Sequence, residues 1–294
     1  MPEITVISGK GGTGKTTVTA AFAHLSGNAV ICDLDVDAPD LHLILQPDRE
    51  VAVDFRAGHL AVIDPARCTA CGLCMDVCRF GAIIEGGGKY VVRPQGCEGC
   101  KTCVALCPAA AIDFPIRRCG RRYRSRTRFG PLIHAQLFPG AENSGLLVSE
   151  LRREARELAI HTGRTIVLSD GAPGIGCPVI SSLTGTQLAV LVTEPTPSGR
   201  HDLERVAELT ARFEVPAAVI LNKADIGGEA ADTVRDACRS RGLPIIAEIP
   251  YDPSVTEAMV AGRAVTEIGP EAVTAPLRTA WSTVLSLTAA RQAA

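Results

Sequence analysis

The sequence VISGKGGTGKTT, residues 6–17, decides the fold of this 294-residue chain. Residues 9–16 match G-x-x-x-x-G-K-[ST] and lie between the apolar run ITVIS (4–8) and a predicted helix, which is the context that a phosphate-binding loop needs. Glycines let backbone N–H groups surround the phosphates, and the helix start adds its positive dipole end. We therefore predict that Lys15 reaches the β- and γ-phosphates of a nucleotide and that Thr16 ligates Mg²⁺. The predicted nucleotide-binding residues of the loop are Gly9, Lys10, Gly11, Gly12, Thr13, Gly14, Lys15, Thr16 and Thr17.

Apolar runs that recur along the chain predict the rest of the architecture. The runs are ITVIS (4–8), AVICDL (29–34), TIVLSD (165–170), LAVLVTE (188–194), AAVILNK (217–223) and PIIAEIP (244–250). Continuous apolar strands that alternate with helices, such as those expected at 144–163 and 198–213, indicate a parallel sheet covered on both faces. The fold class is thus α/β, and the last twenty residues are expected to form a helix that packs against the sheet.

The strand-and-helix pattern breaks between residues 58 and 115, where two cysteine runs appear. The spacing C-x2-C-x2-C-x3-C occurs at Cys68, Cys71, Cys74 and Cys78, and again 29 residues later at Cys97, Cys100, Cys103 and Cys107. We predict a small domain, 58–115, inserted into a larger domain formed by 1–57 and 116–294. Zinc also takes four thiolates, but its sites usually read as two separated C-x2-C pairs, so the spacing favours iron–sulfur clusters. Metal ligation would supply the folding energy that so short an insert lacks.

The duplicated cysteine run resembles a bacterial two-cluster ferredoxin. In that fold the first three cysteines of each run hold one [4Fe-4S] cluster and the fourth crosses to the other. The resemblance implies that Cys68, Cys71, Cys74 and Cys107 bind cluster one, and that Cys97, Cys100, Cys103 and Cys78 bind cluster two. One departure is Arg79, where the pattern has proline. A cation there would tend to raise the potential of its cluster.

Lys10 is a second lysine in a loop whose phosphate chemistry needs one. Residues 10–16, KGGTGKT, resemble the K-G-G-x-G-K-[ST] signature of the deviant P-loop ATPases, the superfamily of MinD, ParA, Mrp and the nitrogenase iron protein. In that superfamily the first lysine crosses a two-fold interface to the partner subunit's nucleotide. The resemblance implies a homodimer with ATP sandwiched at the interface, in which an added cation lowers the barrier only when the partner arrives.

Other segments resemble the switches and base-binding loops of the same superfamily. In CDLDVDAPDLH (32–42), Asp35 is favoured over Asp33 to position the attacking water near Mg²⁺, and Asp33 and Asp37 also fit ordinary turn positions. In LSDGAPGIGCP (168–178), Asp170 is expected to hold a Mg²⁺-bound water and Gly174 to offer its N–H to the γ-phosphate. Asn222 and Pro250 are the candidates for contacts with adenine. The predicted catalytic residues are Lys10, Lys15, Asp35 and Asp170.

Composition and the remaining residues limit the alternatives. The formal charge of −2 shows no nucleic-acid footprint, and no run of about 18 apolar residues predicts a membrane span. The chain begins on a strand-like run, so we expect a cytoplasmic protein whose thiols stay reduced. Cys32 and Cys238 read as packing residues, and Cys177 as mainly structural. The arginine-rich segment 117–128 reads either as a solvated strand or as a docking patch for an acidic partner.

Three hypotheses for function remain. The first is an ATPase whose nucleotide-driven dimer gates electron transfer from two [4Fe-4S] clusters to a redox partner. The second is an assembly or carrier ATPase for iron–sulfur or metal cofactors, of the Mrp type, although no C-x-x-C follows near the later strands. The third is a positioning or regulatory ATPase of the MinD/ParA type, with the clusters as redox sensors. Eight cysteines complete both ligand sets, which favours stable clusters and the first hypothesis.

Overall fold

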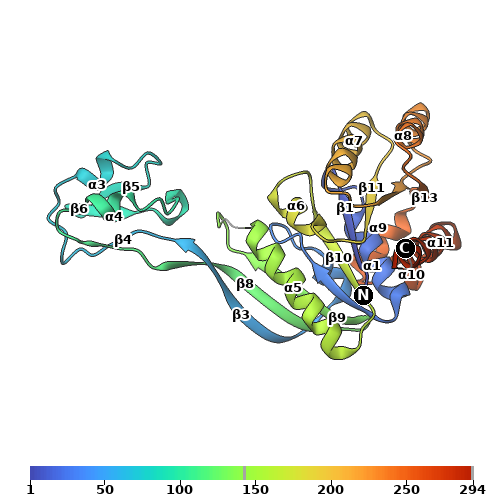
Figure 1. The fold of residues 1–294 in the computed structure, drawn as a ribbon, viewed down its shortest axis with the longest axis horizontal. Coiled ribbons are helices and arrows are strands. Elements are labelled where there is room, and N and C mark those ends of the chain that lie inside the picture. The colour runs from blue at the N-terminus through green and yellow to red at the C-terminus, as the bar shows by residue number, and fades with distance from the viewer. Residues whose placement is uncertain (142–143, 293–294) are drawn as a thin grey trace. The chain divides into compact units, whose positions relative to one another are not determined.

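The computed structural model describes residues 1–141 and 144–292, which form two compact units. We call them the sheet unit, made of Met1–Val53, Arg122–Gln136 and Ser144–Ala294, and the cysteine unit, made of Asp54–Arg121 and Leu137–Asn143. The predicted insert, 58–115, lies inside the cysteine unit, whose bounds are wider. Two long strands, β3 and β8, carry the chain from one unit into the other (Figure 1).

The nine-stranded sheet has the order β13-β12-β11-β1-β10-β2-β9-β8-β3. Every neighbouring pair from β13 to β9 is parallel, which confirms the predicted α/β class. The strands are β1 (Glu3–Ser8), β2 (Ala29–Asp33), β3 (Asp48–His59), β8 (Ile116–Thr127), β9 (Gly130–Leu137), β10 (Ile166–Pro173), β11 (Leu188–Thr193), β12 (Ala217–Asn222) and β13 (Ile245–Ile249). The six predicted runs all become strands, whereas β3, β8 and β9 extend the sheet beyond the prediction.

Apolar side chains cover both faces of the sheet because consecutive residues of a buried parallel strand point to opposite sides. Val190 and Val192 belong to one buried cluster, and Ala189 and Leu191 to the other. Trp281 of α11 joins the first cluster, so the predicted packing of the terminal helix on the sheet is confirmed. The helices of this unit are α1 (Lys15–Ser26), α2 (Leu41–Leu45), α5 (Ser144–Thr162), α6 (Cys177–Leu183), α7 (Pro197–Arg212), α8 (Glu229–Ser240), α9 (Pro253–Val260), α10 (Val265–Ile268) and α11 (Glu271–Gln292).

The carboxyl ends of the parallel strands meet at one edge of the sheet. β1 lies between β10 and β11, and the register of β10 places Asp170 beside Val6 of β1 and Asp33 of β2. The loop after β1 turns into α1 at Gly14, whose φ of 94° is in the left-handed region that favours glycine. In open α/β sheets, ligands bind outside this edge. The fold therefore gathers the loops that carry the predicted nucleotide residues.

The cysteine unit has little regular structure of its own. It holds the strand pairs β4 (Val62–Ile63) with β7 (Ile112–Asp113) and β5 (Ile83–Gly86) with β6 (Lys89–Val92), the helices α3 (Leu73–Asp76) and α4 (Thr102–Leu106), and the 3₁₀ turn Pro94–Gly96. Helices α3 and α4 begin 29 residues apart, at the distance that separates the two cysteine runs. The duplication seen in the sequence is thus also a duplication of local structure.

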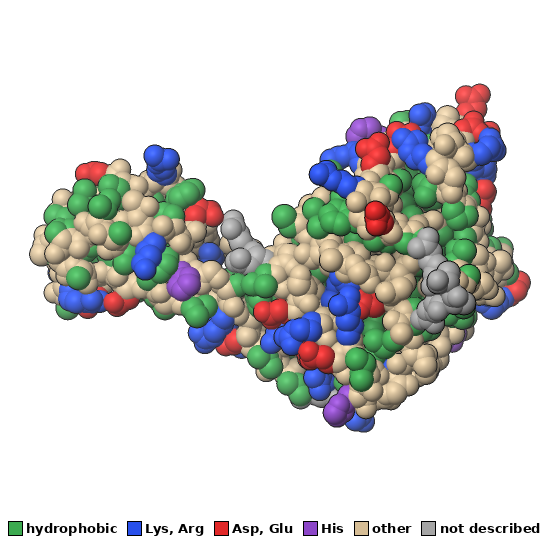
Figure 2. Space-filling model, viewed as in Figure 1, with side chains coloured by type: hydrophobic (Ala, Val, Ile, Leu, Met, Phe, Trp, Pro, Cys, Tyr) green, Lys and Arg blue, Asp and Glu red, His purple; other side chains and the backbone are tan. Residues whose placement is uncertain are grey.

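Charged side chains on the face of the sheet unit drawn in Figure 2 are interleaved in sign rather than gathered into one field. Within residues 1–141 and 144–292, no helix combines the length and the apolar character needed to cross a bilayer.

Candidate functional site

Lys15 and Asp170 form the centre of the predicted nucleotide site. The Lys15 Nζ lies 3.1 Å from Asp170 Oδ1 and 3.4 Å from Asp35 Oδ2. Asp170 is fully buried and accepts hydrogen bonds from Thr16 Oγ1 at 2.7 Å and Thr19 Oγ1 at 2.8 Å. The two threonines and the lysine hold the carboxylate in one position, which is the support that a polar site needs to be preorganised.

The carboxylates around Lys15 outnumber the cations. Burial raises the pKa of Asp33 well above its usual range, and Asp170 adds to the rise; the second carboxyl oxygen of Asp33 is buried without a hydrogen-bond partner among the described residues. Burial also raises the pKa of Asp35. Burial alone lowers the pKa of Lys15, but Asp170, Asp35 and Asp33 outweigh it, so the lysine stays charged. A hard divalent cation with oxygen ligands fits this excess of negative charge.

Lys10 makes its contacts within its own chain. Its Nζ lies 2.5 Å from Glu194 Oε1 and 3.0 Å from Ser198 Oγ, just beyond the end of β11 and at the start of α7. Glu194 is also paired with Lys223 at 3.2 Å. Burial alone raises the pKa of Glu194, but hydrogen bonds from Lys10 and Lys223 outweigh it and the pKa is lowered. In this chain the signature lysine is therefore held by an ionised carboxylate.

The other predicted nucleotide residues line the same edge. Asn222 donates its amide to the Thr13 carbonyl at 2.8 Å, and a Cβ on Gly14 would lie 2.4 Å from the Asn222 amide nitrogen, so Asn222 supports the loop from behind. Gly174 has a φ of 94°, and its N–H donates to the Ser8 carbonyl at 2.8 Å. This N–H is thus engaged with the chain itself, and its predicted phosphate contact would require it to leave Ser8.

Further members of the predicted set occupy the rim of the loop. The Thr13 hydroxyl is buried and has no hydrogen-bond partner among the described residues, so it is available to a ligand that enters the loop. Thr17 donates to the Met259 sulfur at 3.5 Å. Pro250 follows β13, where the Tyr251 N–H donates to Asp225. A Cβ on Gly9 would lie 2.5 Å from Asp202, and Gly11 and Gly12 have open space around them.

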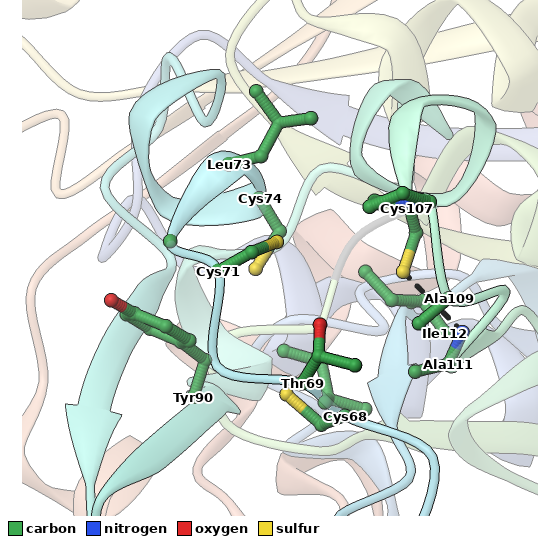
Figure 3. A pocket seen from close by; sticks show the side chains of 13 residues that line it. Cys68, Thr69, Cys71, Leu73, Cys74, Tyr90, Cys107, Ala109, Ala111 and Ile112 are labelled. Atoms are coloured by element: carbon green, nitrogen blue, oxygen red, sulfur yellow. Dashed lines mark hydrogen bonds between the residues drawn. The ribbon is translucent and has the colours of Figure 1, made fainter.

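The first cysteine cavity collects four thiols from both runs. Cys68, Cys71 and Cys74 of the first run and Cys107 of the second line it together with Tyr90. Figure 3 shows the four sulfur atoms around the same space, with the Ala111 N–H donating to the Cys107 Sγ at 3.3 Å. The remaining wall includes the polar residue Thr69 but is otherwise apolar, with Ile63 and Ile112 among its residues.

The second cysteine cavity has the reciprocal composition. Cys97, Cys100 and Cys103 line it together with Cys78 of the first run. The Ala82 N–H donates to the Cys78 Sγ at 3.4 Å, the counterpart of the bond at Cys107. Unlike the first cavity, it is lined by two charged residues, Glu98 and Lys101. Each fourth cysteine thus joins the three cysteines of the other run, in the grouping that the resemblance implies.

The backbone around the thiols adopts left-handed conformations at matched positions. Residues 29 apart share a positive φ, in the pairs Ala70 and Gly99, Gly72 and Lys101, and Gly81 and Ala110. A positive φ is costly for Ala70, Lys101 and Ala110, and such strain is typical of ligand-holding loops. In the part of the chain that the structure describes, no three metal-ligating side chains converge on one ion position.

The arginine-rich segment is divided by its ion pairs. Arg122 and Arg124 of β8 pair with Glu154 of α5 at 3.1 and 3.3 Å, and Arg128 pairs with Glu267 of α10 at 2.6 Å. The segment is a strand, as one of the two readings had it, but Arg122 and Arg128 are only 22% and 27% exposed, and all three arginines connect β8 and the turn after it to helices of the sheet unit. Sequence reasoning could not see these bonds because the partners lie 30 to 139 residues away.

Sequence reasoning also missed Glu194 and Thr19. Glu194 is the last residue of the predicted strand 188–194 and so lies at the ligand-binding edge, which is a positional signal. Thr19 is one helical turn after Lys15, on the same face of α1, but no motif distinguishes it from the neighbouring threonines. Cys177, an exposed residue at the start of α6, joins neither cysteine cavity.

The sheet order, the loop after β1 and the buried aspartates define a nucleotide-binding α/β protein of the P-loop type. The family model described as the CobQ/CobB/MinD/ParA nucleotide binding domain matches residues 4–265. The chain belongs to this family.

Relatives and solved structures agree with this assignment. The uncharacterized protein MJ0578 of Methanocaldococcus jannaschii is 34% identical over 224 residues, covering 75% of this chain and 78% of that protein. The cell division ATPase MinD of Pyrococcus furiosus has a TM-score of 0.58 at 20% identity, covering 97% of this chain and 99% of its own. MinD of Pyrococcus horikoshii, solved with Mg-ADP, has a TM-score of 0.57 at 20% identity, covering 96% and 95%. These structures are similar in fold.

Proposed function

We propose that this protein is an ATP-hydrolysing homodimer that carries two [4Fe-4S] clusters and controls electron transfer from them through its nucleotide state. The proposal keeps the predicted division into an ATPase domain, 1–57 and 116–294, and an inserted ferredoxin-like domain, 58–115. One observation carries it: on a chain with a P-loop ATPase fold, two cavities are each lined by four thiols, three from one cysteine run and one from the other. When bound, the clusters would supply one-electron transfer.

The residues at the sheet edge support ATP hydrolysis. Lys15 is placed to neutralise the β- and γ-phosphates once they compete with Asp170 and Asp35 for its ammonium group. Asp35 is partly exposed and its raised pKa makes it a stronger acceptor for a proton of the attacking water. Water attacks the γ-phosphorus, the bond to the β–γ bridging oxygen breaks, and ADP and inorganic phosphate leave.

Thr16 and Asp170 fit a Mg²⁺ ion. Thr16 would ligate it through the hydroxyl that now donates to Asp170, and Asp170 would stay behind as the acceptor of that hydroxyl and of a metal-bound water. A bound cation would offset the three crowded carboxylates and stabilise the charge of the phosphates.

The proposed homodimer rests on the role of Lys10 as a cation for the nucleotide of the partner subunit. To act on the partner's nucleotide, Lys10 must exchange Glu194 for phosphate oxygens, which carry more negative charge. A lysine that arrives only with the partner makes hydrolysis depend on dimer formation. Replacing Lys10 with alanine is expected to leave ATP binding within about threefold while turnover falls at least a hundredfold, because one cation at the transferring phosphoryl is lost.

The matched comparison is Lys15→Ala, which should weaken binding itself because Lys15 belongs to the same chain's phosphate loop. Binding of a fluorescent ATP analogue and release of phosphate distinguish the two variants. Equal turnover in wild type and Lys10→Ala would remove the proposed role of Lys10 and leave that of Lys15 in place.

Iron content tests the cluster part of the proposal. Protein purified without oxygen should contain about eight irons and about eight acid-labile sulfides per chain, the content of two four-iron clusters. Two zinc ions and no iron would contradict it.

A second function, a MinD/ParA-type positioning or regulatory ATPase with the clusters as redox sensors, is favoured by the fold neighbours, which include MinD with MinC from Aquifex aeolicus and a ParA family ATPase from Chlorobium tepidum. An Mrp-type carrier is the third candidate. ATP-dependent association with a surface or scaffold that changes on cluster reduction would support the sensor. Transfer of iron to an apo-protein would support the carrier.

A further inference from the structure

Positive and negative side chains are unevenly distributed over the cysteine unit, and this distribution indicates the kind of partner that it could bind. Its described residues include nine Lys and Arg side chains and six Asp and Glu. They divide between the two thiol-lined cavities. The neighbourhood of the first cavity has Arg67 and Lys89 against Asp64, Asp76, Glu85 and Asp113, and the neighbourhood of the second has Arg56, Arg79, Arg93, Lys101, Arg117, Arg118 and Arg121 against Asp54 and Glu98.

Contacts place six of these charged residues beside a cavity, and the others are grouped by their position along the chain. Arg67 lies 2.7 Å from both Asp64 and Asp113, which directly follow the first-cavity residues Ile63 and Ile112. Lys101 and Glu98 line the second cavity, and Arg93 donates to the Gly81 carbonyl beside its wall residue Ala82. The first neighbourhood is thus acidic by two charges and the second basic by five.

The basic charge is concentrated around Asp54, on the parts of β3 and β8 that belong to the cysteine unit. Asp54 is surrounded by Arg118 at 2.8 Å, Arg121 at 3.6 Å and Arg56 at 3.8 Å, so one carboxylate faces three guanidinium groups. All three arginines are exposed, at 39%, 51% and 58%. Arg122 and Arg124, the next arginines of the segment, are instead paired with Glu154. The arginine-rich segment therefore has a neutralised half and a half with excess positive charge.

Along the chain, this excess charge follows a wall residue of the second cavity. Phe114 is a wall residue of that cavity and stacks on His59 with ring centroids 4.7 Å apart, and Leu60 donates to the Pro115 carbonyl. From Phe114 to Arg118 the chain advances four residues, about 13 Å of extended strand. Lys101 lies over the same Phe114 ring at 6.0 Å. Lys101 beside this ring, and Arg118, Arg121 and Arg56 around Asp54 farther along the chain, are the four residues that we call the basic path.

We propose that this basic path, Lys101, Arg56, Arg118 and Arg121, is the docking surface for an acidic one-electron carrier protein, which exchanges electrons at the second cysteine set. The inference rests on the proposed iron–sulfur function for its redox half and on charge for its binding half. A surface of one sign steers an oppositely charged protein and raises its association rate by 10- to 1000-fold at low salt. Nucleic acid is the poorer occupant, because tight binding of its backbone uses about six to ten phosphate contacts and Glu98 and Asp54 interrupt this path.

Two haem proteins serve as probes. A soluble cytochrome b5 domain is acidic and cytochrome c is basic, and each ferric haem takes one electron from the dithionite-reduced protein to become ferrous. Binding to immobilised cytochrome b5 is measured by surface plasmon resonance at about 20 mM and about 300 mM salt, where the Debye length differs several-fold. Haem reduction is followed by stopped flow.

The test variant is Arg56→Gln with Arg118→Gln and Arg121→Gln. The matched control replaces Arg153, Arg239 and Arg278 of the sheet unit with glutamine, which removes the same charge at exposures of 63%, 77% and 45%. At low salt the test variant should bind cytochrome b5 at least tenfold more weakly and reduce it at least tenfold more slowly, while the control stays within twofold. Lysine at the three positions should restore binding, and at high salt all proteins should converge. Reduction of cytochrome c should not fall in the test variant.

Three results would overturn the proposal: unchanged binding in the test variant, equal losses in the test and control variants, or tighter arginine-dependent binding of a random-sequence DNA duplex than of cytochrome b5. Iron content and the visible spectrum confirm that the test variant keeps its fold. Protein that holds no iron contradicts the proposed function instead, and the binding arm still decides whether the basic path takes an acidic protein.

Discussion

The interiors of the sheet unit and of the cysteine unit are built in different ways. The sheet unit buries two large apolar clusters against the faces of its sheet. In the described residues of the cysteine unit, eight apolar side chains are buried, and four of them are alanines: Phe55, Ala57, Ala61, Ala82, Ile83, Ala111, Ile112 and Cys119. The interior of that unit is instead formed around two sets of four thiols. We therefore expect the sheet unit to fold on hydrophobic burial alone and, under the proposed function, the cysteine unit to depend on what its cysteines bind.

The largest effect should come from removing iron. Chelation without oxygen is expected to open the cysteine unit, raising amide exchange across residues 54–121 by at least a hundredfold, because the ligation energy disappears. The sheet unit should keep its melting temperature. Trp281, the one tryptophan of the chain, reports it, since its ring packs 5.0 Å from Phe22 in the first apolar cluster.

Single cysteine variants sharpen the same contrast. Cys107→Ser should remove iron from the first set of thiols and raise amide exchange in the cysteine unit. Cys177 lies outside both cavities, so Cys177→Ser should leave the iron content unchanged. Equal iron in both variants, or loss of the Trp281 transition on chelation, would mean that the units do not differ as we infer.

Sequence reasoning reached unequal depths in the two units. The parallel strands were predictable because buried strands read as continuous apolar runs, such as AAVILN in β12. β8 was ambiguous because RRYRSRT alternates charged and polar residues, and the acidic partners of Arg121, Arg122 and Arg124 lie far away in the sequence. The grouping of Cys107 with the first run came from the resemblance to two-cluster ferredoxins, since the spacing of the repeat alone does not say which thiols meet. The contact of Lys10 with Glu194 joins residues 184 apart, and no local pattern encodes it.

The loss of folding stability at acidic pH should show how the ion pair between Arg128 and Glu267 holds the turn after β8 against the sheet unit. Burial alone raises the pKa of Glu267, but hydrogen bonds from Arg128, the Ala264 N–H and Arg263 outweigh it and lower the pKa to about 2. The pKa of an unfolded glutamate is about 4.3, so this stabilisation is complete above that pH and is lost as the pH falls toward 2. Glu267→Gln should cost about 2 kcal/mol at pH 7 and flatten the pH dependence between pH 4.5 and 2.

Urea unfolding followed by Trp281 fluorescence provides the measurement. Glu248→Gln is the control, because Glu248 is also paired with an arginine, Arg235, but its side chain is 39% exposed and screened by water. A loss at pH 7 no larger than that of Glu248→Gln would show that Arg128 does not secure the strand through Glu267.

A smaller effect is expected at Glu194. Replacing it with glutamine removes the charge that holds Lys10 and should lower the cost of moving the lysine by about 0.5 kcal/mol in each protomer. The sum for the dimer is about 1 kcal/mol, so dimers should appear at about fivefold lower protein concentration with a non-hydrolysable ATP analogue. Sedimentation velocity measures this, with Glu204→Gln of α7 as the control, since that carboxylate pairs with Arg200 and not with Lys10. Weaker dimerisation of Glu194→Gln would mean that Glu194 helps the interface instead of restraining the lysine.

The central claim is that the nucleotide state controls electron transfer between a partner and the clusters bound by the eight thiols of the two cysteine runs. The most direct test is a redox titration of the anaerobic protein by electron paramagnetic resonance, run with ADP and with a non-hydrolysable ATP analogue, alongside the rate of electron transfer to cytochrome b5. We predict a dimer with the ATP analogue and a monomer with ADP. Between these two states, either the rate of electron transfer changes at least threefold or the midpoint potential shifts by the equivalent amount. Identical potentials and rates in both states, with about eight irons present, would contradict the claim.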